Sequence, residues 1–169
     1  MDQSLHENVR AQLGCSLAVA GLMDEAMAAF ASALLRDSNC AWTRMWAAES
    51  LGGPWGVPYL DVLVESLRDR KVHYSLWAAY RVADFAFGAL SKIPDTRAAK
   101  ELRQAVAQLE AELHADDEEL RALATFALTR QGHRAALHQL RILAHNNEQA
   151  EDLLHELDRV ENDRALGRI

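Results

Sequence analysis

Apolar residues recur at helical spacing along nearly the whole chain, and this periodicity constrains the fold more than any other feature. Short interruptions separate the periodic segments near Gly21, 37–39, 52–58, Lys71, 93–96, 115–116, 131–132 and 146–147. With eight Gly and three Pro in 169 residues, the sequence offers little punctuation for strands. We therefore predict an all-α protein of about nine helices, in which short connections make neighbouring helices antiparallel.

The boundaries of several helices follow from this pattern. Residues 72–92, between two interruptions, are expected to form one helix. A longer helix is expected over about residues 95–114, where Asp95 or Thr96 can cap its first turn. The last helix is expected over about residues 147–165 and is polar on most sides, so it is interpreted as a cap of the stack.

An internal repeat joins two of these segments. The sequence Met-Trp-Ala-Ala at residues 45–48 recurs 31 residues later as Leu-Trp-Ala-Ala at residues 76–79. A fixed period of this size is typical of stacked helix pairs, because adjacent Ala residues let neighbouring helices approach closely at equivalent places. With the residues between the copies, Leu51-Gly52, Pro58, Leu60, Leu63, Leu67, Asp69 and Val72, the pattern resembles the HEAT-like repeats of phycobilisome-lyase-type proteins. The resemblance covers about residues 41–90 and, more faintly, 116–145.

Residues 7–40 resemble a different unit, a single tetratricopeptide (TPR) repeat. The matching positions are Leu13-Gly14, Leu17, Gly21, Asp24-Glu25-Ala26, Phe30, Ala33-Leu34 and Asp37. Small residues at Gly14, Ala26 and Ala33 would allow close helix packing, with Phe30 filling the gap between them. Because one repeat cannot bury its own face, we expect one continuous α-solenoid domain over residues 1–169, with longer helices and a capping pair over 95–169.

Aromatic residues are concentrated in the middle of the chain. Nine of the eleven lie between residues 42 and 87. We expect Trp46 and Trp77 to occupy equivalent positions of successive repeats, with Trp42 and Tyr74 one turn before them. The candidate partner-binding residues are these four aromatics and two flanking cations: Trp42, Arg44, Trp46, Tyr74, Trp77 and Arg81. The alternative is that these aromatics fill the core between repeats, as large aromatics commonly do.

Two polar clusters have plainer explanations than a reactive site. His138, His145 and His155, with nearby acids on the last helix, are the one metal-like set, but ligands from further helices are missing, so a solvated face is preferred. A second set of acids is interpreted as solvated, helped by two acids near the start of a helix, where the macrodipole favours negative charge; the alternative is that it binds a basic partner. The set is Glu110, Glu112, Asp116, Asp117, Glu118 and Glu119. Neither a metal nor a cofactor is predicted.

The charge distribution limits the possible partners. Residues 1–100 carry ten Lys/Arg against eleven Asp/Glu, whereas residues 101–169 carry eight against fourteen, and the net charge is −7. This field disfavours nucleic acid and suits a basic partner. The first residues lack a signal-peptide pattern, and no apolar stretch is long enough to span a bilayer. We therefore expect a cytoplasmic protein with reduced cysteines and no membrane partner.

The predicted function is that of a non-catalytic scaffold, adaptor or chaperone-like module. It would bind a protein or peptide through a concave, aromatic-rich face. The alternative is a helical-repeat enzyme or enzyme subunit, such as the chromophore-lyase-like factor that the HEAT-like resemblance implies. A helical-repeat enzyme acting on nucleic acid is a third class, which the acidic charge disfavours.

Overall fold

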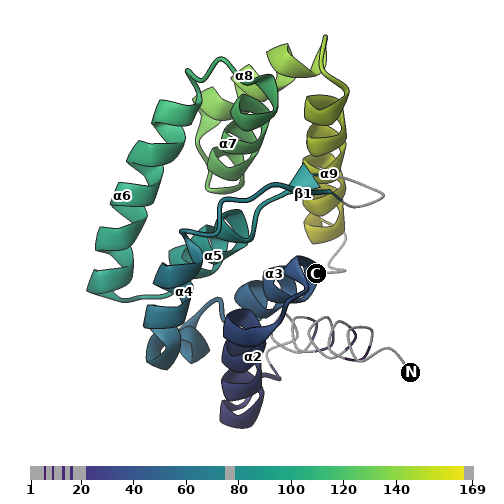
Figure 1. The fold of residues 1–169 in the computed structure, drawn as a ribbon. Coiled ribbons are helices and arrows are strands. Elements are labelled where there is room, and N and C mark those ends of the chain that lie inside the picture. The colour runs from purple at the N-terminus through teal and green to yellow at the C-terminus, as the bar shows by residue number, and fades with distance from the viewer. Residues whose placement is uncertain are drawn as a thin grey trace. The chain divides into compact units, whose positions relative to one another are not determined.

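The computed structural model describes residues 22–74 and 79–165, together with positions 6, 9, 13 and 16. In this part of the chain it contains eight α-helices, one 3-10 helix and one two-stranded hairpin (Figure 1), against about nine helices predicted for the whole chain. The all-α prediction is confirmed. None of the helices placed there combines the length and the apolar character that crossing a membrane requires.

The chain falls into two compact units. Unit 1 comprises residues 1–71 and 81–102, and unit 2 comprises residues 72–80 and 103–169. Each unit is therefore built from two separate stretches of sequence, and the boundary between the later stretches lies inside a single helix, α6 (Thr96–Glu112).

Unit 1 is built around one central helix. The helix α3 packs against both α2 and α5, and α4 packs against α5. The elements are α2 (Glu25–Asp37), α3 (Ala41–Ser50), the 3-10 helix η1 (Pro54–Tyr59), α4 (Leu60–Ser66), α5 (Val82–Ser91) and the first turns of α6. Asp24 caps α2, because its Oδ1 accepts a hydrogen bond of 2.8 Å from the Met27 amide.

Small residues allow segments of unit 1 to approach each other closely. Ala47 and Ala48, on α3, are fully buried, as are Ala86 and Ala89 on α5. At Gly56, a Cβ atom would lie 2.1 Å from the carbonyl oxygen of Leu51, so only glycine fits there. The close packing predicted at Ala47-Ala48 is confirmed. The packing predicted at Ala26, Phe30 and Ala33 is not, because these residues are exposed and α2 buries its opposite face instead.

The helix predicted for residues 72–92 is not formed at residues 73–74 and 79–80. His73–Tyr74 (β1) and Ala79–Tyr80 (β2) form an antiparallel pair instead, with His73 opposite Tyr80 and Tyr74 opposite Ala79. The rings of His73 and Tyr80 stack with centroids 5.8 Å apart, and Ala79 is buried in the core of unit 2. These contacts outweigh the helical periodicity, and α5 begins only at Val82.

Unit 2 contains the rest of α6 and three mutually packed helices, α7, α8 and α9. They span Glu118–Arg130, Arg134–Ala144 and Glu148–Ala165, close to the predicted boundaries. Gly132, with φ of +83°, turns the chain between α7 and α8. Their core is apolar and consists of Ala79, Ala122, Leu123, Leu140, Ala150, Leu153 and Leu157.

The long helix predicted over residues 95–114 is confirmed as α6, from Thr96 to Glu112. Asp95 is its cap, because its Oδ1 accepts hydrogen bonds from the Arg97 and Ala98 amides at 2.7 and 3.2 Å. The first helix of the predicted TPR-like pair lies outside the described residues, apart from positions 9, 13 and 16.

Candidate functional site

Two of the predicted binding residues, Trp42 and Trp46, lie one turn apart on α3 in unit 1. Their ring centroids are 5.9 Å apart and their planes are inclined by 80°, which is an edge-to-face contact. Both are half-buried, whereas Met45 and Ala48 on the same helix are buried. The pair is therefore held against unit 1 and still presents aromatic surface.

Charged residues fix the edges of α3. Arg44 Nη1 lies 2.9 Å from Asp69 Oδ2, in the segment after α4, and Glu49 Oε1 lies 2.6 Å from Lys92 Nζ at the end of α5. All four side chains except that of Lys92 are less than a third exposed, so solvent screens these pairs only in part. The backbone beneath the two Trp rings is thus tied to two other segments of unit 1. We call Trp42, Arg44 and Trp46 the α3 surface.

The indole Nε1 of Trp46 is a buried hydrogen-bond donor. This atom is covered and has no acceptor among the described residues. A buried donor left unpaired costs on the order of 1–3 kcal/mol.

The other three candidate residues lie elsewhere. Arg81 is fully buried in unit 1, where its Nε and Nη2 atoms each donate a 2.9 Å hydrogen bond to the Asp84 carboxylate. Arg81 therefore stabilises the first turn of α5 from a buried position. Tyr74 is 69% exposed on β1 of unit 2. Trp77 lies outside the described residues, so its predicted alignment with Trp46 stays a prediction.

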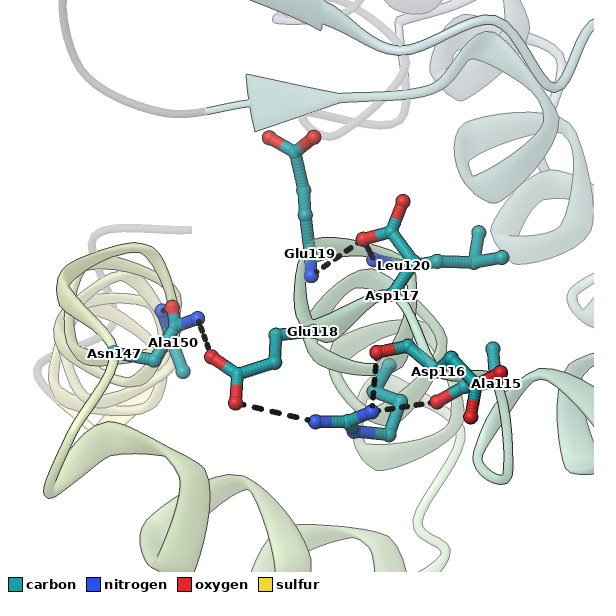
Figure 2. Close-up of polar contacts among 9 residues, drawn as sticks. Ala115, Asp116, Asp117, Glu118, Glu119, Leu120, Asn147 and Ala150 are labelled. Carbon is teal, nitrogen blue, oxygen red and sulfur yellow. Dashed lines mark hydrogen bonds and ion pairs between the residues drawn. The ribbon is translucent and has the colours of Figure 1, made fainter.

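The acidic run before α7 is held in a hydrogen-bond network of unit 2, and Figure 2 shows its members. Asp117 Oδ1 accepts hydrogen bonds from the Glu119 and Leu120 amides, at 2.9 and 3.2 Å, and so caps the helix. Glu118 lies between α7 and α9: its Oε1 is 3.4 Å from Arg121 Nη2, and its Oε2 accepts a 3.4 Å bond from Asn147 Nδ2. Asp116, Asp117 and Glu118 are exposed, as predicted, and Asp117 and Glu118 also make these specific contacts.

Tyr74 ties the hairpin to the same region. Its hydroxyl donates a 2.7 Å hydrogen bond to Glu119 Oε2. This bond, with smaller effects from desolvation and from the charges of Glu119 and Asp117, raises the pKa of the Tyr74 phenol. No local sequence pattern predicts this contact, because the two residues are 45 positions apart.

The histidines of α8 and α9 make only local contacts. His145 Nδ1 lies 3.0 Å from the Arg141 carbonyl oxygen, and His155 Nε2 lies 3.8 Å from Glu151 Oε1. Over the described ranges, no group of three or more His, Cys, Asp or Glu side chains is arranged to hold a metal ion.

Comparison with known proteins assigns no family or function to these residues. No protein-family model, curated protein or solved structure matches the chain.

Proposed function

We propose that this protein is a non-catalytic, helical-repeat adaptor that binds a protein or peptide partner through the α3 surface. The observation that carries the proposal is the half-buried, edge-to-face pair of Trp42 and Trp46. The wider architecture that we propose is a TPR/HEAT-like solenoid, supported by the helix pairing within each unit and by the small residues at its helix contacts.

The composition of the α3 surface suits a binding hot spot. Trp and Arg are the residues most enriched among the few side chains that carry interface affinity. The edge-to-face contact restrains both rings before binding, so little side-chain entropy is left to lose. The ion pair of Arg44 with Asp69 gives the same helix a polar margin.

The partner that we propose is apolar where it meets the Trp pair and basic elsewhere. The apolar part follows from the aromatic surface that the half-buried Trp42 and Trp46 rings still present. The basic part follows from the net charge of −7, which steers positively charged partners to the protein.

The test combines partner capture with affinity measurement. Full-length protein is used to capture and crosslink partners from cells, and each identified partner is then titrated calorimetrically against wild type and Trp46→Ala. We expect Trp46→Ala to weaken binding by about 30-fold or more, because hot-spot truncations cost about 2 kcal/mol or more.

Trp55→Ala is the matched control, because Trp55 is an exposed Trp on η1 in the same unit but outside the α3 surface. It should leave affinity unchanged. Equal affinities of wild type and a folded Trp46→Ala protein, judged by circular dichroism, would remove the α3 surface as the binding site.

A further inference from the structure

A second exposed apolar face lies on α2, away from the α3 surface. Ala26, Ala29, Phe30 and Ala33 are all exposed and follow the i, i+3, i+4, i+7 spacing of one helix face. Phe30, at the centre, is 39% exposed. The opposite face is buried in unit 1 through Ala28, Ala31, Leu34 and Leu35. We call the four exposed residues the α2 stripe.

We propose that the α2 stripe binds the same stripe of a second copy of this chain, as an antiparallel helix pair related by a two-fold axis. The stripe has the spacing that such an axis requires. Reversing the helix places Ala26 opposite Ala33 of the partner subunit and Ala29 opposite Phe30 of the partner subunit. Each Phe30 ring then faces a small residue, and the Ala pairs let the two backbones approach closely.

The charges beside the stripe select the antiparallel orientation. Glu25 and Arg36 are exposed, near opposite ends of α2 and about three helical turns apart, so they lie on the same flank of the stripe. In an antiparallel pair, Glu25 meets Arg36 of the partner subunit, and the symmetry makes this contact twice. A parallel pair would instead place like charges at the same level.

The contact is a single pair of short helices. It is smaller than the interfaces of stable dimers, so the pair should form and separate with protein concentration. Its two exposed ion pairs should be weakened by salt.

The first experiment measures the mass of the full-length protein by sedimentation equilibrium across a wide concentration range. We expect a monomer–dimer equilibrium, and we expect Phe30→Glu to shift it to monomer because it places like charges at the centre of the pair. Trp55→Glu, which changes an exposed aromatic outside the stripe, should leave the equilibrium unchanged.

The second experiment tests the register by disulfide trapping. In a protein with Cys15→Ser and Cys40→Ser, single Ala26→Cys and Ala33→Cys variants are oxidised separately and as a mixture. The mixed disulfide should dominate, because only residues 26 and 33 are opposite each other. A protein that stays monomeric, or equal trapping of all three pairs, would overturn the proposal.

Two other occupants of the α2 stripe would give different results. If another segment of the same chain covers it, Phe30→Glu lowers the thermal stability of a monomer without changing its mass. If a different protein covers it, purified wild type stays monomeric and Phe30→Glu leaves its stability unchanged. Either result would contradict self-association.

Discussion

At the scale of single residues, the hydrogen bond between Tyr74 and Glu119 makes a prediction about pH. Because the carboxylate accepts from the phenol, the pKa of Tyr74 lies above the ordinary tyrosine value of about 10. A raised pKa means that the contribution of this bond to stability is complete below about pH 10 and is lost as pH rises through the folded-state pKa. Absorbance titration of the phenolate should show one tyrosine titrating above the ordinary range.

Glu119→Gln is expected to return this pKa toward its ordinary value, because the accepting charge is removed. Glu118→Gln is the matched control, since Glu118 contacts Asn147 and Arg121. An unchanged tyrosine titration in Glu119→Gln would show that the bond is absent in solution.

The buried pair of Arg81 and Asp84 makes a prediction about stability. Arg81→Met removes one partner and leaves the Asp84 carboxylate, which is only 7% exposed, without its guanidinium. We expect the free energy of unfolding to fall by about 3–5 kcal/mol. Chemical denaturation with urea measures it.

The double variant Arg81→Met/Asp84→Leu is the informative comparison. Because no buried charge remains, it should be more stable than Arg81→Met alone. A double variant less stable than either single one would mean that the pair itself, with its remaining contacts, contributes net stability.

At the scale of elements, the cap of α7 sets a third prediction. Asp117→Ala removes the acceptor of the Glu119 and Leu120 amides and should cost about 1 kcal/mol of stability. Asp116→Ala is the control, because Asp116 contributes its backbone carbonyl to Arg121 in this network, and that atom is kept. Equal urea midpoints for Asp117→Ala and wild type would contradict the assigned cap.

The sequence predicted the elements that depend on local signals. Asp95 before α6, Gly132 between α7 and α8, and the helical period of α7 to α9 act within a few residues, and those boundaries are confirmed. Residues 73–74 and 79–80 were wrongly predicted as helix, because the strand pair is stabilised by Ala79 in the core of unit 2 and by the His73–Tyr80 contact. Such tertiary contacts override periodicity.

The candidate site was likewise predictable only where local sequence spacing determines it. Trp42 lies one helical turn before Trp46, as predicted, and this spacing brings the two rings into contact. Arg81 was predicted to flank the aromatic binding surface, but it is buried, and its burial depends on the bidentate pairing with Asp84. The Asp69 partner of Arg44, 25 positions away, had no sequence signal.

At the scale of the whole molecule, the two units predict separate patterns of hydrogen exchange. Leu123→Ala, in the core of unit 2, should lower stability by about 2–5 kcal/mol and speed amide exchange in α7, α8 and α9. The amides of β1 and β2 should follow, because residues 72–80 belong to unit 2. Exchange in α3 should change less.

Leu63→Ala is the matched control, because Leu63 is a fully buried Leu of unit 1. It should speed exchange in α3 and α5 and leave α8 nearly unchanged. If either variant deprotected both units equally, the molecule would unfold as one cooperative body.

The discontinuity of unit 2 also bears on how the chain folds as it is made. Residues 72–80 leave the ribosome before α7 to α9 exist, whereas unit 1 needs nothing beyond residue 102. At about 5–20 residues per second, the interval between Tyr80 and a complete α7 is on the order of seconds. During that interval the nascent hairpin has no core to enter, so Ala79 stays accessible to chaperones until the last third of the chain is translated.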